Sequence, residues 1–221
     1  MSSASFRNNE TAPNFITYIL SPPGLHPGVL HMKITLRAFS ESDASRLIGW
    51  MTSADLLIQW AGPSQFTFPL TEIQLKHYMD GAKGEQPTRR IFTATIEDGC
   101  VAGHIELGAI NRENRTATVC RVFISPHVRG KGYCHPMVHE ALKIGFEELD
   151  LRRIELRVYS FNKAAIQCYL KAGFVKEGLL RKSQKVGDHF WDTVLMAILV
   201  EEWIQMRPDA EPVLSSPARI E

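Results

Sequence analysis

A glycine-rich loop with two cationic side chains is the segment of this sequence best suited to chemistry. It lies within residues 122–134, where a predicted strand ends and a predicted amphipathic helix follows. Arg129 and Lys131 alternate there with Gly130 and Gly132. Glycines let the backbone approach a ligand closely, and the free N–H groups at a helix N-terminus attract phosphate. The loop therefore indicates a phosphate or pyrophosphate site, with a plain basic turn as the alternative for an isolated Gly-x-Gly.

A second motif follows the loop further along the chain. Residues 162–174 read as an amphipathic helix capped by Asn162 and closed by Gly173. Together with the Arg129-x-x-Gly132 segment, this helix resembles motifs A and B of the GNAT superfamily of acyl-CoA-dependent N-acyltransferases. The resemblance runs from about residue 34 to residue 203. Residues 34–37, 174–178 and 187–192 are most similar to the RimJ/RimL type of that superfamily.

The resemblance implies a binding site for coenzyme A. Backbone amides of residues 129–134 would hold its pyrophosphate, and Asn162 would lie beside the pantetheine arm, a role compatible with a plain helix cap. Cys134 departs from the family, which usually has Gly or Ala at that position. The implied cofactor-binding residues are Val122, Phe123, Ile124, Arg129, Gly130, Lys131, Gly132, Tyr133, Cys134 and Asn162.

The resemblance also implies catalytic groups. Tyr169 matches a tyrosine that lies near the thioester sulfur, where a phenol can donate to the departing thiolate. A backbone amide near Val122 or Phe123 would contact the thioester carbonyl. The group that takes the proton of the amine is less defined: Glu106, His104 and an ordered water are the candidates, and we favour Glu106. The alternative for Tyr169 is an ordinary aromatic residue of the core. The alternative for Glu106 is a solvent-facing residue of its strand.

Aromatic residues are the candidates for the acceptor site. Trp60 and Phe66 lie in a turn-rich segment that matches one wall of the acceptor cleft in the family, and Trp191 belongs to the predicted final hairpin. The alternative is that these side chains fill the core or a dimer contact. His135 and His139 have i, i+4 spacing but no evident third ligand, so we expect no metal site.

Hydrophobic periodicity supports the fold that the resemblance implies. Strands are predicted at residues 33–37, 91–96, 101–107, 117–124, 154–158, 174–181 and 190–199, and helices at 42–51, 71–78, 138–149 and 162–173. A strand, helix, strand order after residue 117 requires one parallel pair. We expect an α/β (α+β) fold with a mixed, mostly antiparallel sheet of six to seven strands, a central parallel pair and helices on both faces.

Composition and patterning limit the classes of protein. The chain has 221 residues, with 25 Lys and Arg against 24 Asp and Glu, a net charge of +1. This balance argues against a protein that coats nucleic acid or an anionic membrane, and no apolar run is long enough to span a bilayer. The four cysteines show no metal-ligand spacing, and we expect reduced thiols in a cytoplasmic protein.

Proline-bearing stretches at both ends bound one predicted domain at residues 32–204. We expect either a disordered tail or an upstream extension at 1–31, and a loose tail at 205–221. The upstream-extension alternative carries the hypothesis that Met32 is the native start. The predicted function is transfer of the acetyl group of acetyl-CoA to a primary amine by direct attack in a ternary complex. Protein N-termini, amino acids, polyamines and antibiotics all remain candidate acceptors, and a homodimer is compatible. The alternatives are a non-catalytic acyl-CoA-binding or regulatory module and a protein that binds another phosphate ligand.

Overall fold

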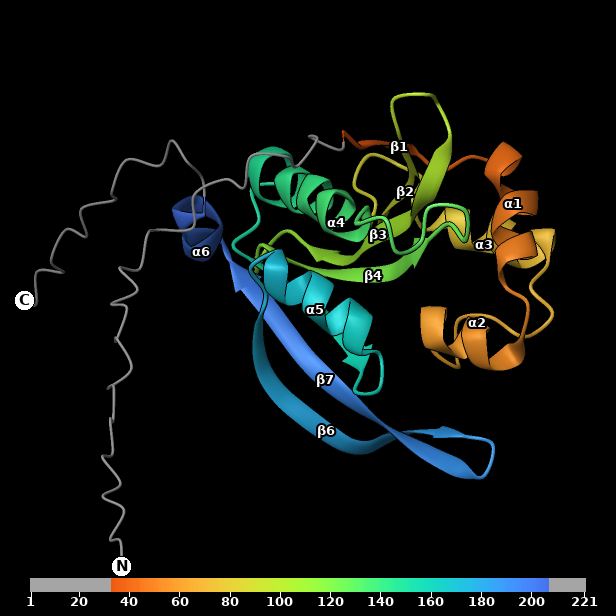
Figure 1. The fold of residues 1–221 in the computed structure, drawn as a ribbon. Coiled ribbons are helices and arrows are strands. Elements are labelled where there is room, and N and C mark those ends of the chain that lie inside the picture. Colours follow the sequence, from red (N-terminus) through yellow and green to blue (C-terminus); the bar gives the residue numbers. More distant parts are fainter. Residues whose placement is uncertain (1–32, 207–221) are drawn as a thin grey trace, which may run out of the picture. The chain divides into compact units, whose positions relative to one another are not determined.

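A computed structural model describes residues 33–206 of the chain (Figure 1). The predictions for the tail at 1–31, for a start at Met32 and for the chain after residue 206 lie outside the described residues. Within 33–206, no helix has the length and apolar character needed to cross a bilayer.

The described residues form a seven-stranded sheet in the order β1-β2-β3-β4-β5-β7-β6. Its strands are β1 (Thr35–Ala38), β2 (Arg90–Thr95), β3 (Val101–Asn111), β4 (Thr116–Ile124), β5 (Arg153–Tyr159), β6 (Val175–Val186) and β7 (His189–Leu199). The central pair β4–β5 is parallel, whereas the other neighbouring strands are antiparallel. This arrangement confirms the predicted fold class.

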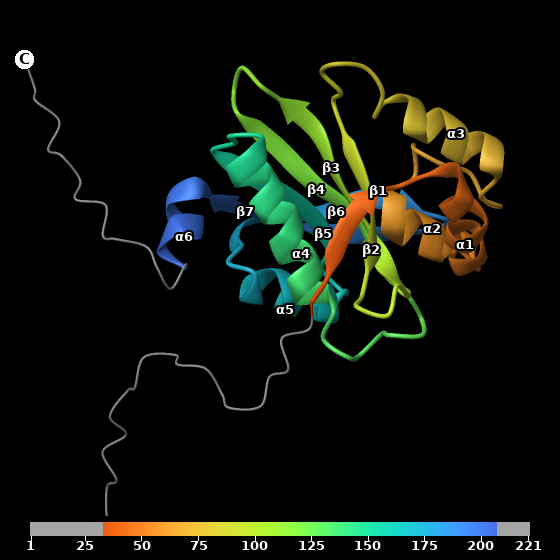
Figure 2. The ribbon, with the colours of Figure 1, turned by 90° about the horizontal axis from the view of Figure 1, so that it is seen from above.

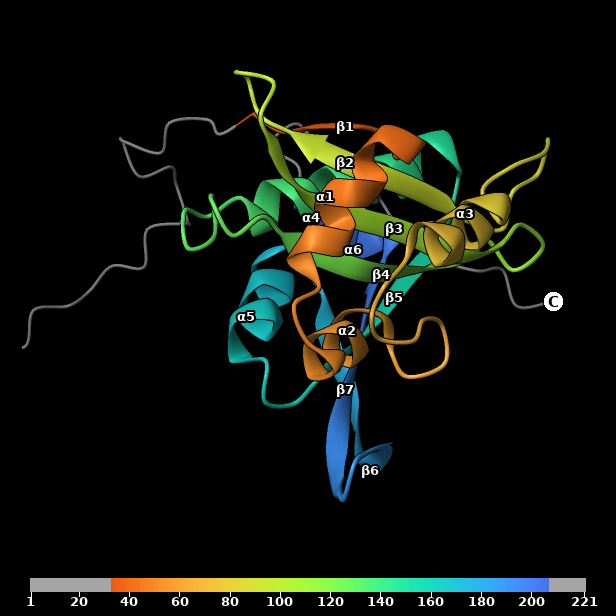
Figure 3. The ribbon, with the colours of Figure 1, turned by 90° about the vertical axis from the view of Figure 1, so that its right-hand side faces the viewer.

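Helices cover both faces of the sheet. They are α1 (Ala44–Trp50), α2 (Ala54–Ala61), α3 (Glu72–Asp80), α4 (Cys134–Lys143), α5 (Lys163–Lys171) and α6 (Val200–Gln205), with short turns of 3-10 helix at Glu41–Asp43 and π-helix at Ile144–Glu148. In the view of Figure 2, α4 and α5 lie on one side of the strands and α1, α2 and α3 on the other. Figure 3 turns the α1–α3 side toward the viewer.

Alternation along the strands explains these two layers, because successive side chains of a strand point to opposite faces. On β2, Ile91 packs into a core with α1, α2 and α3, while its neighbour Phe92 packs into the core beneath α4 and α5. On β3, His104 and Glu106 lie on the first side, and Ile105 lies on the second. Side chains from α1–α3 therefore meet the same face of the central strands as Glu106.

The sequence patterns did not predict helices α2 and α6. Helix α2 begins after Ser53, whose hydroxyl accepts a hydrogen bond from the Leu56 amide at 3.2 Å. It has only 8 residues, too few for an apolar stripe to stand out, and Trp60 lies in its last turn rather than in a loop. Helix α6 has 6 residues and continues to Gln205, just past the predicted domain end at residue 204.

A disulfide joins α4 to α5, which corrects the expectation of four reduced thiols. Cys134 and Cys168 are bonded across a Cα–Cα distance of 6.3 Å, whereas Cys100 and Cys120 are free. The two half-cystines are 34 residues apart in the sequence. They meet because α4 and α5 pack side by side on one face of the sheet, a relation that cysteine spacing does not reveal.

Candidate active site

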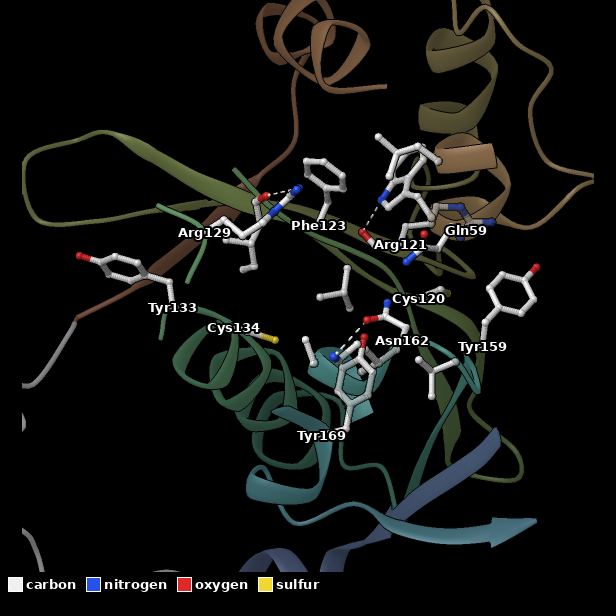
Figure 4. A pocket seen from close by; sticks show the side chains of 18 of the residues that line it. Gln59, Cys120, Arg121, Phe123, Arg129, Tyr133, Cys134, Tyr159, Asn162 and Tyr169 are labelled. Carbon is white, nitrogen blue, oxygen red and sulfur yellow. Dashed lines mark hydrogen bonds between the residues drawn. The ribbon is translucent and has the colours of Figure 1, made fainter. Parts of the chain in front are cut away.

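The site begins where the two parallel strands separate. β4 and β5 are paired only from Thr116 with Arg153 to Val119 with Leu156, and both strands continue beyond that point without pairing to each other. A cavity of about 570 Å³ occupies the gap (Figure 4). Its lining residues come from the end of α2, the separated parts of β4 and β5, the loop before α4, and α5. The cavity therefore opens between two neighbouring strands of the same sheet.

A β-bulge in β4 shapes one wall of this cavity. His104 of β3 pairs with Phe123 and Glu106 pairs with Cys120, so β4 has one more residue than β3 in this interval. Arg121 takes the extra place with φ of +52°, a left-handed conformation that is uncommon for a residue with a side chain. The Trp60 indole N–H donates to the Arg121 carbonyl at 2.8 Å. This bond fixes the peptide between Arg121 and Val122, whose N–H must point opposite to that carbonyl.

The glycine-rich loop closes one end of the cavity. Gly130 and Gly132 have φ of +80° and +90°, which only glycine adopts without strain. The Arg129 guanidinium lies 5.1 Å from the centre of the Phe123 ring and donates to the Ile124 carbonyl at 3.3 Å. These contacts hold the cation at the mouth of the gap, beside the N-terminus of α4. A pyrophosphate fits a loop of this kind.

Most of the predicted cofactor residues meet at this cavity. The lining includes Val122, Phe123, Ile124, Arg129, Gly130, Gly132, Tyr133, Cys134 and Asn162. Lys131 is exposed and does not line it. Cys134 lines it from the first position of α4 while bonded to Cys168, so the departure from Gly or Ala places half of a disulfide next to the loop.

Helix α5 supplies two polar side chains to the opposite wall. The Asn162 side-chain oxygen Oδ1 caps the helix by accepting from the Ala165 amide at 3.2 Å, so the same residue both caps α5 and lines the cavity. Tyr169 reaches from α5 toward the part of β4 that carries Cys120 (Figure 4). Burial, with a smaller effect of Cys120, raises the pKa of Tyr169 well above its usual range. The phenol is therefore protonated at neutral pH, and its hydroxyl has no hydrogen-bond partner among the described residues.

Glu106 lies in a buried cluster behind the cavity rather than in it. Its side chain is 1% exposed and accepts from the Tyr78 hydroxyl at 2.5 Å and from the Arg121 guanidinium at 2.6 Å. The Arg89 Nε atom lies 3.9 Å away. The Glu106 carboxylate is thus surrounded by two guanidinium groups and a phenol. Glu106 lines neither cavity of the site. This placement argues against Glu106 as the group that deprotonates an incoming amine.

His104 belongs to the same cluster. Its Nε2 atom lies 3.2 Å from the Tyr78 hydroxyl, and the ring is 1% exposed. Burial, together with the charge of Arg121, lowers the pKa of His104 to about 3. A neutral, enclosed imidazole cannot exchange protons with an amine in the cavity, so His104 does not take the place of Glu106.

A second cavity of about 310 Å³ adjoins the first and continues away from the glycine-rich loop. Trp60, Arg121 and Tyr159 line both cavities. Phe66 lines neither, because it stacks behind Trp60 at 5.5 Å between ring centres and is 5% exposed. Trp191 also lines neither and packs edge-on against Tyr159 at 4.8 Å. Of the three predicted acceptor residues, only Trp60 faces the site.

Several lining residues had no signal in the sequence. Gln59, Arg121, Arg157 and Tyr159 lie at the junction of the two cavities. The position of Arg121 depends on the bulge in β4. The positions of Arg157 and Tyr159 depend on the point at which β5 separates from β4. Among residues 33–206, no group of three or more His, Cys, Asp or Glu side chains is placed to hold a metal ion.

Comparison with known proteins identifies the family and the fold. Residues 33–175 match the family model described as an acetyltransferase (GNAT) domain. The chain belongs to the GNAT acetyltransferase family. This acetyltransferase is 27% identical over 176 residues to a spermidine N(1)-acetyltransferase of Vibrio cholerae, covering 79% of the chain and 98% of the relative. It is 28% identical to that of Escherichia coli K12 over 172 residues, 77% of the chain and 88% of the relative.

A solved structure supports the same family assignment. The spermidine N-acetyltransferase of Vibrio cholerae in complex with CoA and spermine superposes with a TM-score of 0.68 and 25% identity, covering 77% of this chain and 98% of that one. The predicted acyl-CoA-dependent acetyltransferase activity and the predicted cosubstrate acetyl-CoA are thereby confirmed. The residues around the first cavity fit that cosubstrate, because a left-handed glycine loop, a helix N-terminus and a strand gap follow one another along it.

Proposed function

We propose that this acetyltransferase passes the acetyl group of acetyl-CoA to a primary amine by direct attack within a ternary complex. The observation that carries the proposal is the pair of adjoining cavities. One runs from the glycine-rich loop to Tyr169, and the other opens beyond Trp60 and Arg121. Two substrates that enter from opposite ends can meet at the strand gap, so no covalent enzyme intermediate is needed.

Acetyl-CoA is assigned to the first cavity. The backbone amides of residues 129–134 would hold the pyrophosphate, and Asn162 would lie along the pantetheine arm. The thioester carbonyl would accept a hydrogen bond from the amide of Val122 or Phe123 beside the bulge. An amide that is fixed before the reaction stabilises the oxyanion that forms on attack. The contact between Trp60 and the Arg121 carbonyl supports this assignment for Val122.

Tyr169 is assigned to the sulfur. Attack by the amine forms the carbon–nitrogen bond, and collapse of the oxyanion then breaks the carbon–sulfur bond. The CoA thiolate that leaves can be stabilised by a phenol that donates a hydrogen bond. Because its pKa is raised, Tyr169 holds its proton more tightly than a free thiol does at neutral pH. The expected role is therefore hydrogen-bond donation to the thiolate, with protonation of sulfur completed from solvent.

A water molecule is the proposed acceptor for the proton of the amine. Neither cavity has an Asp or Glu among its described lining residues, and Glu106 is held by Arg121 and Tyr78. An amine that enters partly unprotonated requires no strong base, and water can carry its second proton away as the bond forms.

The remaining sequence predictions stay proposals. The motifs at residues 34–37, 174–178 and 187–192 support the RimJ/RimL type, and the predicted domain at 32–204 is kept. Cytoplasmic location and a homodimer are also kept, although a disulfide is unusual in the cytoplasm. Cell fractionation and light scattering of the purified chain test these two proposals.

Substitution of Tyr169 tests the catalytic assignment. Release of CoA thiol from acetyl-CoA is measured for the wild type and for Tyr169→Phe across a panel of amines that includes spermidine. We expect kcat to fall by about 10²-fold for loss of a positioned hydrogen-bond donor to the leaving thiolate, with unchanged calorimetric affinity for acetyl-CoA. Unchanged kcat would remove Tyr169 from the mechanism. Acetyl-CoA binding with no thiol release from any amine would instead indicate the non-catalytic binding module.

A further inference from the structure

We propose that the amine acceptor carries a carboxylate or another anionic group close to its amine, and that Arg157 binds this group. The inference rests on the proposed function and narrows its substrate class. It separates this chain from its relatives that are named for spermidine, a molecule that carries only positive charges.

The charge of the cavity walls is the first observation. The second cavity is lined by Arg121 and Arg157 together with uncharged side chains, and the first adds Arg129. No Asp or Glu lines either cavity among the residues that the structure describes. A site for a polycation needs carboxylates, because an ammonium group taken out of water must be paired.

The ion pair of Arg121 does not cancel the positive charge of this wall. Glu106 serves two guanidiniums, those of Arg121 at 2.6 Å and Arg89 at 3.9 Å. Tyr78 and His104 complete the cluster without charge, since burial raises the pKa of the first and lowers that of the second. The cluster behind the cavity thus has one positive charge more than it has negative charges.

Arg157 is the group left to bind a ligand. It is exposed on β5, and its side chain makes no hydrogen bond or ion pair with another residue of 33–206. Arg153, four positions earlier on the same side of the strand, differs: it holds Glu177 through two hydrogen bonds of 2.7 and 2.6 Å and also reaches Glu155 at 3.3 Å. The nearest carboxylate along the strand is therefore already paired with Arg153, and Arg157 lines both cavities without a carboxylate partner among the described residues.

A guanidinium with two parallel N–H groups matches the two oxygens of a carboxylate. The uncharged polar groups around it, including Gln59, Ser183 and Gln184, suit the amide or hydroxyl groups of an amino acid or peptide. A polyamine in the same place would meet Arg121 and Arg157 as like charges. The cavity therefore favours an amine with a nearby anion over a neutral amine, and a neutral amine over a polyamine.

Matched acceptors test the preference. Thiol release with acetyl-CoA is measured for a set of α-amino acids, for the corresponding carboxamides and for spermidine, with kcat/KM expressed per unprotonated amine. We expect the acids to exceed their amides by about tenfold or more, the effect of one charge-assisted hydrogen bond, and spermidine to be the poorest acceptor. Amides that equal their acids, or spermidine as the best acceptor, would overturn the inference while leaving the acetyltransferase proposal intact.

Reversing the charge of residue 157 tests whether Arg157 causes the preference for acids over amides. The Arg157→Glu variant should lose the preference for acids and turn over spermidine faster than the wild type, whereas Arg157→Lys should keep part of the preference. Arg181→Glu makes the same change of charge at an exposed residue of β6 that lines neither cavity, so it should behave as the wild type. An unchanged preference in Arg157→Glu overturns the assignment. Absence of thiol release with every amine, despite acetyl-CoA binding, would instead refute the proposed function.

Discussion

Replacing Glu106 by Gln separates a structural role from a catalytic one. The carboxylate is 1% exposed and accepts hydrogen bonds from Tyr78 and Arg121, with Arg89 close by. Glutamine keeps the shape and can still accept from the Tyr78 hydroxyl, but it removes the only negative charge that the described residues place between the two guanidiniums. Both arginines then stay in the cluster without a counter-ion.

The magnitude follows from that pairing. Removing one partner of a buried ion pair costs about 3–5 kcal/mol, and the retained acceptor oxygen places the expected loss near the lower end, about 3 kcal/mol. With a urea m-value of about 2 kcal/mol per M, the unfolding midpoint should fall by roughly 1.5 M. Loss of a general base would instead slow turnover by about 10²–10⁴-fold.

Two measurements on the same variant distinguish these outcomes. Equilibrium urea unfolding reports stability, and initial rates of thiol release at a temperature where Glu106→Gln is fully folded report catalysis. Glu148→Gln is the matched control, because Glu148 pairs with Arg90 at the surface with 58% exposure and should change stability by less than about 1 kcal/mol. If turnover slows by about 10²-fold or more while the urea midpoint stays unchanged, the structural role is refuted and Glu106 is restored as the base.

Two further predictions concern stability. Burial alone would raise the pKa of Asp43, but hydrogen bonds from Arg37, the Ser40 amide and Thr93 lower it far below its usual range. The stabilisation is therefore present above the unfolded pKa and is lost as the pH falls below about 4. Between pH 7 and pH 3, the melting temperature of Asp43→Asn should fall less than that of the wild type. Equal falls in melting temperature for the two proteins would contradict this prediction. Reducing the disulfide, which spans 34 residues, should cost at most about 4 kcal/mol, and the unreduced, denatured chain should titrate two thiols, not four.

Local patterns explain what could be predicted. Alternation of period two placed the strands of the central sheet, and Thr71 and Asn162 marked the helices that they cap in the structure. The left-handed Gly130 and Gly132 likewise follow from residue type, because few other residues adopt that backbone. These features depend on neighbours in the sequence, so the sequence alone determined the fold class and the position of the glycine-rich loop.

Long-range contacts decided the rest. Glu106 looked like one alternating strand residue among others, yet Tyr78 from α3 and Arg121 from the bulge of β4 enclose it. The strand gap, the disulfide between α4 and α5 and the free guanidinium of Arg157 likewise arise where distant segments meet or separate. Pairing partners determine burial and charge, and no local period encodes them. The chemistry of the family was therefore readable from the sequence, whereas the groups that line the two cavities were decided only by the tertiary structure.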